Sequence, residues 1–310
     1  MKKLITILTP CYNEEENVEA LCIAVRKQFE LLPQYDYEHI FIDNASKDRT
    51  VDILKTVAKG DNHVKIIVNV KNFGHIRSPY YGMLQGRGDA VISIVADFQD
   101  PIEMIPVFLS KWEDGYKIVI GIKKQSNENP LMFKMREIFY SMIKKMSETE
   151  QIKNFTGFGL YDKEFVDILR RIDDPYPYFR GMVSEFSFDR YEINYTQPIR
   201  KRGKTKNNFY TLYDMAMLGF VDHSKMPLRL ASFIGFGVAI LSSLVAIVYF
   251  VYKIVFWNEF SLGIAPLVIG LFFFSSVQLF FIGIIGEYVG AIHTQVRKRP
   301  LVIEKERINF

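Results

Sequence analysis

Carboxylate, amide and hydroxyl side chains gather directly after the short apolar runs of this sequence, where each run ends. They occupy residues 9–14, 43–48, 72–74 and 97–100. Such side chains can hydrogen-bond a base and a ribose, and their oxygens can hold a hard divalent cation against a diphosphate. A nucleoside diphosphate that leaves during a reaction needs its charge neutralised as it departs. The pattern therefore indicates a site for a nucleotide together with a divalent cation.

The elements that must position these groups can be read from periodicity. Short β-branched runs cover residues 4–8, 39–42, 64–68, 90–95 and 117–122. Helix-length segments such as 15–32 and 49–58 lie between them, and their apolar residues recur at intervals of three and four. This alternation predicts an α/β fold with a doubly wound, mostly parallel sheet that binds ligands outside the carboxyl ends of its strands. Neither GxGxxG nor GxxxxGKS/T occurs, which disfavours a dinucleotide Rossmann site and a P-loop.

A single Asp or Ser after a strand is also a common helix cap or turn former. Ser46 and Asp48 directly precede the helical segment at 49–58, so a capping role and a ligand role are equally supported for them. A ligand role is favoured for Asp97, because it ends an apolar strand and has no helix of its own until after Pro101.

Two uncharged apolar runs lie near the C-terminus, at residues 230–252 and 262–285, and contain 23 and 24 residues. At about 1.5 Å per residue each can cross a hydrocarbon core of about 30 Å, which disfavours two buried helices of a soluble protein. Basic residues flank the pair on both outer sides, while the connecting loop carries only Lys253 and Glu259. The positive-inside rule therefore predicts an integral cytoplasmic (inner) membrane protein with two spans and both termini in the cytoplasm.

These features divide the chain into a cytosolic head at 1–220, a membrane hairpin at 221–290 and a cytosolic basic tail at 291–310. Residues 131–147 mix apolar and basic side chains, which predicts either an interfacial amphipathic helix or, equally, a core-packed helix. The formal net charge of +4 is too small to indicate a nucleic-acid partner. Cys11 and Cys22 form no metal-binding pattern, which favours a reduced, cytosol-facing head.

Six segments in order carry a resemblance to a known family. They are PCYNEEENV at 10–18, IDNASKDRT at 42–50, NFGH at 72–75, VADFQDP at 95–101, RKRGKTK at 200–206 and GEYVG at 286–290. Together with the apolar hairpin, they resemble the polyprenyl-phosphate branch of the inverting family 2 glycosyltransferases. This branch includes the dolichol-phosphate mannose synthases and the bacterial undecaprenyl-phosphate (bactoprenol) glycosyltransferases. The resemblance implies a GT-A-like nucleotide-sugar-binding domain followed by a two-helix transmembrane hairpin.

The resemblance also implies roles for individual residues. The nucleotide-binding set is Pro10, Tyr12, Glu14, Asp43 and Asn44. Asp97 and Gln99 would meet Mg²⁺ or Mn²⁺ and the diphosphate, and together with Arg200 and Lys206 they form the catalytic set. Arg180, Arg200 and Arg202 would contact the acceptor phosphate. The alternative for residues 200–206 is a patch attracted to anionic lipid, and for Arg180 an ordinary surface arginine.

Three positions depart from the family pattern. Val95 stands where relatives carry the first acid of DxD, and it cannot ligate a metal. Asn44 replaces an acid at the end of the second motif. Gly157 occupies the place where relatives often carry an acid that acts as the base. A lipid phosphate is already largely ionised near neutral pH, so the nucleophile needs positioning more than deprotonation.

The implied function is transfer of a sugar from a nucleotide diphosphate sugar, UDP-linked for preference, to undecaprenyl or another polyprenyl phosphate at the cytosolic membrane face. The transfer would proceed with inversion and supply a lipid-linked monosaccharide for cell-envelope glycosylation. Val95 and Gly157 motivate an alternative, a catalytically weakened protein that binds nucleotide or lipid and supports another membrane enzyme. The sequence leaves open the sugar, the final glycoconjugate, the preferred metal and whether the chain forms a homo-oligomer. A processive polysaccharide synthase is disfavoured, because neither tryptophan follows an arginine as in QxxRW.

Overall fold

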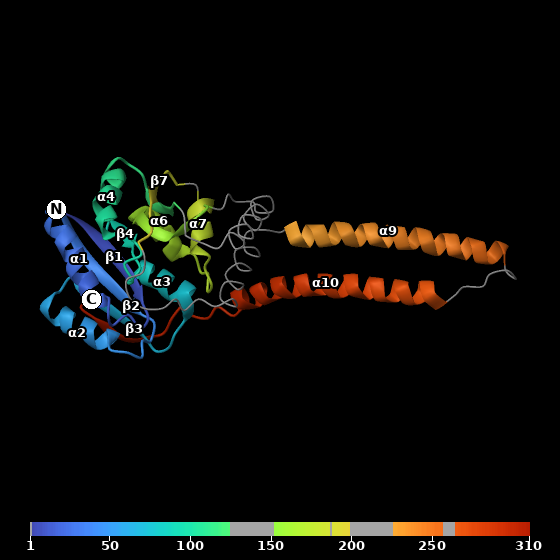
Figure 1. Cartoon of the computed structure of the whole chain (residues 1–310), viewed down its shortest axis with the longest axis horizontal. Coiled ribbons are helices and arrows are strands. Elements are labelled where there is room, and N and C mark those ends of the chain that lie inside the picture. Colours follow the sequence, from blue (N-terminus) through green and yellow to red (C-terminus); the bar gives the residue numbers. More distant parts are fainter. Residues whose placement is uncertain (1, 125–151, 187, 199–225, 257–263) are drawn as a thin grey trace.

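The computed structural model describes residues 2–124, 152–186, 188–198, 226–256 and 264–310 of the chain. A head built from strands and helices lies at one end, and two long helices extend away from it (Figure 1). Residues 131–147, for which the sequence predicts an amphipathic or core-packed helix, lie outside the described residues.

The head contains one eight-stranded sheet with the order β7-β5-β6-β4-β1-β2-β3-β8. The strands are β1 (Lys3–Cys11), β2 (Tyr35–Asp43), β3 (Val64–Asn69), β4 (Ala90–Ser93), β5 (Ile118–Lys123), β6 (Phe155–Asp162), β7 (Arg190–Tyr195) and β8 (Glu304–Ile308). All five predicted strands form, and β4, β1, β2 and β3 make the predicted parallel centre. The sheet is mixed outside that centre, because β6 runs antiparallel to β4 and β5, and β8 runs antiparallel to β3.

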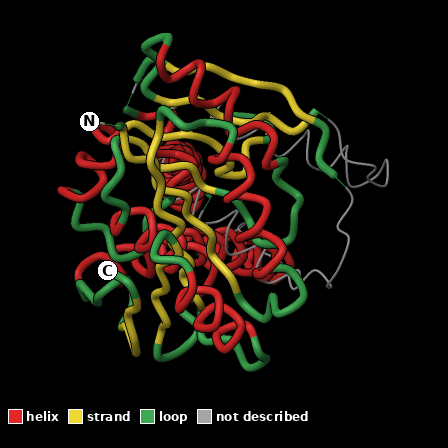
Figure 2. The backbone as a smooth tube through the Cα atoms, turned by 90° about the vertical axis from the view of Figure 1, so that its left-hand side faces the viewer, coloured by secondary structure: helices red, strands yellow, loops and turns green. Residues whose placement is uncertain are grey.

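Helices cover both faces of the sheet (Figure 2). Helices α1 (Val18–Glu30), α2 (Thr50–Gly60) and α4 (Ile105–Glu113) pack on one face, and the short 3-10 helix η1 (Ile102–Met104) leads into α4. Helices α3 (Gly74–Gln85), α6 (Lys163–Arg171) and α7 (Phe179–Glu185) pack on the other face. Successive side chains of β1 point to opposite faces, so Ile7 joins the first core and Leu8 the second. The alternation of strand and helix therefore produces the predicted α/β head.

The last residues of the chain belong to the head, whereas the sequence predicts a separate basic tail at 291–310. β8 extends the sheet beside β3, and Asn309 Nδ2 donates hydrogen bonds to the carbonyl oxygens of Ala58 and Val64 at 2.9 and 3.0 Å. Lys55 and Glu306 form an ion pair across the same edge at 2.5 Å. The charged sequence of β8 does not look like a strand. It forms one because it pairs with the backbone at the edge of β3, which is far away in the sequence.

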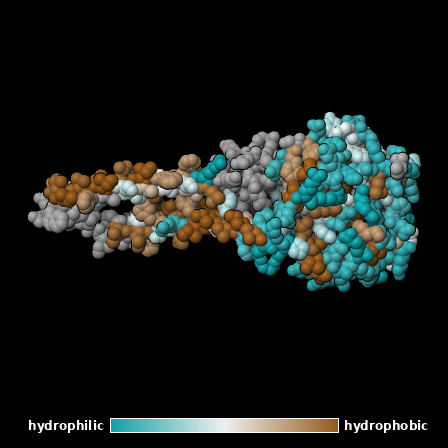
Figure 3. All heavy atoms as spheres, turned by 180° about the vertical axis from the view of Figure 1, so that it is seen from behind, coloured by the Kyte–Doolittle hydropathy of each residue, from teal (hydrophilic) through white to brown (hydrophobic). Residues whose placement is uncertain are grey.

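Two apolar helices, α9 (Met226–Val255) and α10 (Ile264–Val296), lie side by side beyond the head (Figures 1 and 3). Their candidate membrane spans, Leu228–Tyr252 and Gly270–Val296, contain 25 and 27 residues, and neither window is buried inside the protein. At about 1.5 Å per residue, each span is long enough for a hydrocarbon core of about 30 Å. The end of α10 is tied to the head, because Gln295 Nε2 donates to Asp174 Oδ1 at 2.9 Å. The exposed apolar surface of the pair indicates association with a membrane.

Candidate active site

The loops that follow β1 and β2 are joined to each other at the carboxyl edge of the sheet. The backbone N–H of Asn13 donates to Ser46 Oγ, and the N–H of Lys47 donates to Asn13 Oδ1, both at 2.8 Å. Asn13 and Ala45 adopt positive φ angles of 55° and 62°, so both loops turn sharply where they meet. Parallel pairing of β1 with β2 brings the two loops together, as the sequence predicts.

The first predicted nucleotide-binding segment lies at this edge. Pro10 pairs with Ile42 at the end of β1, and Tyr12 and Glu14 follow it with partly exposed side chains. Glu14 Oε2 accepts a hydrogen bond from Asn17 Nδ2 at 2.7 Å, which holds that carboxylate against the start of α1. The three residues are therefore close in the fold and accessible to a ligand, and their role in nucleotide binding stays a prediction.

Asp43 is a fully buried carboxylate at the end of β2. Its Oδ2 accepts the N–H of Ser46 at 2.9 Å, and its Oδ1 accepts the hydroxyl of Ser46. Burial raises the pKa of Asp43 above its ordinary value, and these hydrogen bonds partly oppose that rise. Ser46 therefore braces the loop. Asp48 acts similarly, because its Oδ1 accepts from the N–H and hydroxyl of Thr50 at the start of α2 at 3.1 and 2.6 Å.

Asn44 joins the end of β2 to the loop between β3 and α3. Its amide donates to Asn72 Oδ1 at 2.9 Å and to the carbonyl of Gly74 at 3.0 Å, and its Oδ1 accepts the N–H of Phe73 at 2.8 Å. Both amide hydrogens are therefore used within the chain. Asn44 therefore has no amide hydrogen left for the nucleotide contact that the resemblance implied, because the segment at 72–75 folds against this side chain.

We expect Asn44→Ala to lower the free energy of unfolding by about 1–3 kcal/mol, because it leaves the partly buried N–H of Phe73, the side chain of Asn72 and the carbonyl of Gly74 without their partner. Urea unfolding of the full chain in detergent, followed by circular dichroism, measures this change. If Asn44→Ala leaves the stability unchanged and weakens nucleotide binding, the predicted structural role is wrong and Asn44 contacts the nucleotide.

The loop after β4 carries the residues predicted to act on the diphosphate. Asp97 is 8% exposed, and its Oδ1 accepts the N–H of Gln99 at 3.1 Å. Phe98 between them has a φ of 59°, a left-handed conformation that is uncommon for a residue with a side chain. Val95 is 37% exposed and has no oxygen to offer. The carboxylate of Asp97 therefore lies in this loop close to the partly exposed Gln99.

Asp100 braces this loop, a role that the sequence did not assign. It is 4% exposed and accepts the N–H of Val95 at 3.0 Å and the hydroxyl of Tyr195 at 3.3 Å. Burial, with a contribution from the charge of Asp97, raises the pKa of Asp100 to about 7. Tyr195 ends β7 and lies 95 residues away in the sequence, so no local pattern could reveal this contact.

The donor set fits a divalent cation only in combination with a ligand. Among the described residues, no group of three or more His, Cys, Asp or Glu side chains is placed to hold a metal ion. Asp97 and Gln99 offer one carboxylate and one amide oxygen. Mg²⁺ is commonly bound through one or two carboxylates together with substrate phosphates. These two residues therefore fit a cation that arrives with a diphosphate, and they do not form a complete cage.

The residues predicted to bind the acceptor phosphate are partly described. Arg180 lies on α7, and its Nη1 donates to the carbonyl of Phe155 at 3.5 Å. Phe155 begins β6, which runs antiparallel to β4, so Arg180 lies at the same edge as Asp97. Arg200, Arg202 and Lys206 lie outside the described residues.

Gly157, at the place where relatives often carry an acid, lies in β6 and has a φ of 103°. That conformation strains any residue with a Cβ, so the backbone here suits glycine rather than an acid.

Comparisons with known proteins identify the family of this chain. The profile of glycosyl transferase family 2 matches residues 6–171. The chain is 33% identical over 303 residues to the SfII prophage-derived bactoprenol glucosyl transferase of Shigella flexneri, with 97% of each chain covered. It is 32% identical over 304 residues to the bactoprenol glucosyl transferase of Shigella phage SfX, covering 98% of this chain and 99% of that protein. Mannosyl-3-phosphoglycerate synthase from Rubrobacter xylanophilus matches with a TM-score of 0.48 and 14% identity, over 69% of this chain and 71% of that one. The family profile and the full-length relatives show that the chain belongs to glycosyl transferase family 2.

Proposed function

We propose that this protein transfers a sugar from a nucleotide diphosphate sugar to undecaprenyl phosphate, or a similar polyprenyl phosphate, at the cytosolic face of the membrane. The observation that carries the proposal is the similarity to bactoprenol glucosyl transferases over 97% of both chains, which includes the head and both apolar helices. The names of these relatives indicate glucose as the sugar, so UDP-glucose is the first donor to test.

The direction of the strands supports a lipid acceptor. β8 enters the sheet from the side of α10 and runs antiparallel to β3. The carboxyl ends of the parallel strands, and with them Asp43 and Asp97, therefore face the two apolar helices (Figure 1). A phosphate at the membrane surface can approach this edge, and the cations of residues 200–206 follow β7 in the sequence by only a few positions.

The reaction that we propose is a single displacement. A phosphate oxygen of the acceptor forms a bond to the anomeric carbon, while the bond from that carbon to the nucleotide diphosphate breaks and the diphosphate leaves with the electron pair. One displacement inverts the anomeric configuration. A phosphate monoester has a second pKa of about 6, so its nucleophilic oxygen is already ionised and no base is needed at Gly157.

In this proposal the chain binds and orients the two substrates. Pro10, Tyr12 and Glu14 would hold the nucleotide, and the buried Asp43 would fix the loop beside them through Ser46. Arg180, Arg200, Arg202 and Lys206 would place phosphates by charge. Asp97 and Gln99 would hold Mg²⁺ or Mn²⁺, which when bound neutralises the charge of the diphosphate.

The experiment is a transfer assay with the purified full-length protein and undecaprenyl phosphate. Radiolabelled UDP-glucose, UDP-N-acetylglucosamine and GDP-mannose are supplied separately, and chloroform-soluble label is counted. We expect one donor to give a labelled lipid, with an anomeric configuration opposite to that of the donor by NMR. If nucleotide binds but no donor gives a lipid product, the alternative of a non-catalytic partner for another membrane enzyme replaces this proposal.

We also propose that α9 and α10 both cross the membrane and that the head and both termini are cytoplasmic. The end of α10 is held on the head, because Lys298 Nζ lies 2.9 Å from Asp173 Oδ2 in addition to the contact of Gln295. A reporter fused after Phe310 should therefore behave as cytoplasmic, and one inserted near Asn258 as external. A C-terminal reporter that is active only outside the cell would rule out this topology.

A further inference from the structure

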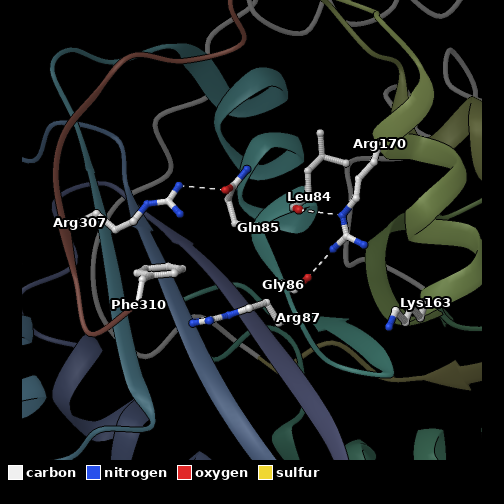
Figure 4. A pocket seen from close by; sticks show the side chains of 8 residues that line it. All are labelled: Leu84, Gln85, Gly86, Arg87, Lys163, Arg170, Arg307 and Phe310. Atoms are coloured by element: carbon white, nitrogen blue, oxygen red, sulfur yellow. Dashed lines mark hydrogen bonds between the residues drawn. The ribbon is translucent and has the colours of Figure 1, made fainter.

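A cavity of about 480 Å³ opens on the head at the edge of the sheet opposite to the candidate active site. Arg87 lies just before β4, and Lys163 and Arg170 lie on α6 (Figure 4). Arg307 lies on β8, and Phe310 follows that strand by two residues. β4 begins and β6 ends at this edge, so the cavity lies at the amino-terminal side of the parallel strands. Its volume falls in the range of small-ligand sites, which is roughly 300–1,000 Å³.

The side chains that line this cavity carry charge of one sign only. Four of its lining side chains are basic and none is acidic. Arg170 is held in place, because its Nε donates to the carbonyl of Leu84 at 3.0 Å and its Nη1 pairs with Asp167. Arg307 is held similarly, because its Nε donates to Glu304 Oε2 at 3.0 Å and its Nη2 to Gln85 Oε1 at 2.9 Å. Fixed guanidinium groups lose little side-chain freedom when an anion binds.

Several donors in the cavity remain available. Within the described part of the chain, neither Lys163 Nζ nor the guanidinium of Arg87 makes a hydrogen bond, although Arg87 Nε lies within ion-pair distance of Glu38. The nearest carboxylate to Arg87 is Glu38, at 3.8 Å, and it already accepts hydrogen bonds from Lys65 and from Thr6. These ammonium and guanidinium groups can donate to phosphate oxygens without breaking an existing hydrogen bond.

Phe310 adds a flat surface to the cationic cavity. Its ring centroid lies 4.5 Å from Arg307 Cζ and 5.9 Å from Arg87 Cζ. Figure 4 shows Arg307, Phe310 and Arg87 on one side of the opening and Arg170 and Lys163 on the other. Lys65 Nζ lies 5.5 Å from the same centroid, so the ring is set among cations. A phenyl ring with guanidinium groups beside it offers flat surfaces on which an aromatic base can stack.

We propose that this cavity binds a nucleoside diphosphate, with the base stacked beside Phe310 and the phosphates held by Arg87 and Lys163 near the fixed positive charge of Arg170. The site is separate from the candidate active site and does not depend on the transfer reaction. Its ligand would connect β8 to α6 and to the turn before β4, three segments that are distant in the sequence. Binding should therefore hold β8, which follows α10, more firmly against the sheet.

Hydrogen–deuterium exchange of the full-length protein in detergent tests this proposal. UDP at ten times its dissociation constant should slow exchange of the amides in β8 by about tenfold, because binding lowers the open population by 1 + [L]/Kd. The double substitution Arg87→Gln and Lys163→Gln should abolish this protection and leave any protection at residues 9–14 unchanged. Lys111→Gln, which removes an exposed charge on α4 that pairs with Asp114, is the control for loss of a surface charge and should retain the protection of β8 by UDP.

Pyrophosphate, which has the phosphates of UDP but no base, distinguishes the contribution of the phosphates from that of the base. We expect it to protect β8 less than UDP does, and Phe310→Leu should weaken protection by UDP while leaving protection by pyrophosphate unchanged. Equal protection by pyrophosphate and UDP would overturn the assignment of a nucleotide, since the base would then contribute nothing. Unchanged exchange of β8 with both probes would overturn the site altogether. Neither outcome bears on the transfer assay, so failure here is distinct from failure of the proposed function.

Discussion

Replacing Asp97 by Asn should lower turnover by about 10²- to 10³-fold, the size of loss typical when one charge-stabilising group is removed from an active site. The amide keeps an oxygen that can accept the N–H of Gln99, so the turn at 97–99 should persist. What is lost is the negative charge that we propose lies opposite the cation on the donor diphosphate, and Val95 supplies no second carboxylate. Glycosyl transfer and the thermal midpoint, measured on the same preparation, give the result.

Asp61→Asn is the matched control for this substitution. Asp61 precedes β3 at the opposite edge of the sheet and pairs with Arg26 at 2.5 Å. Its loss removes the same charge far from the site and should leave turnover unchanged. We also expect chelation with EDTA to stop transfer by the wild-type protein and added Mg²⁺ or Mn²⁺ to restore it. Full activity of Asp97→Asn, or transfer that is indifferent to EDTA, would remove Asp97 from the catalytic set.

Asp100→Ala should lower turnover by about 10²-fold, because a displacement near 1 Å of a positioned group is enough for such a loss. The substitution leaves the N–H of Val95 and the hydroxyl of Tyr195 without the oxygens that they contact. The loop that carries Asp97 would then lose its connection to β7. We expect the concentration of Mg²⁺ that gives half-maximal rate to rise as well, since Asp97, the carboxylate that we propose meets the cation, is no longer held. Asp100→Asn keeps an acceptor oxygen and should recover most of the activity.

Asp100→Ala could lose activity because the protein unfolds or because the loop of Asp97 is displaced, and a second variant distinguishes these two causes. Leaving buried polar groups unpaired costs about 1–3 kcal/mol, so Asp100→Ala should also lower the thermal midpoint. Asp89→Ala provides a comparable loss elsewhere, because Asp89 Oδ2 accepts the N–H of Leu4 at 2.9 Å at the far edge of the sheet. It should lower the midpoint and leave the metal dependence unchanged. If both variants lose activity only in proportion to the folded fraction, Asp100 has a structural role and no positioning role.

Much of the architecture could be predicted because its causes are local. β-branched runs, spaced apolar residues and uncharged stretches long enough for a bilayer are visible over short windows, and they predicted the five strands, the α/β head and the two apolar helices. The carboxyl-edge rule also correctly predicted that the polar segments after β1, β2 and β4 meet at one edge. The catalytic and binding roles of Asp97, Gln99, Tyr12 and Glu14 stay predictions.

The tertiary structure decided what depends on partners far apart in the chain. β6 contains two glycines, Gly157 and Gly159, and β8 is a run of charges, so neither looks like a strand until β4 and β3 supply the backbone on which it pairs. Asn44 has the side chain of a ligand, yet the third motif folds against it and uses its amide hydrogens. Asp100 acts on the loop of Asp97 only because β7 brings the hydroxyl of Tyr195 beside it. The sequence alone thus determined the elements and the edge where the chemistry lies, since these follow from local hydrophobic pattern and strand direction. Which polar groups at that edge remain for a ligand was decided by packing, since a side chain can bind a ligand only through hydrogen bonds that the fold has not already used.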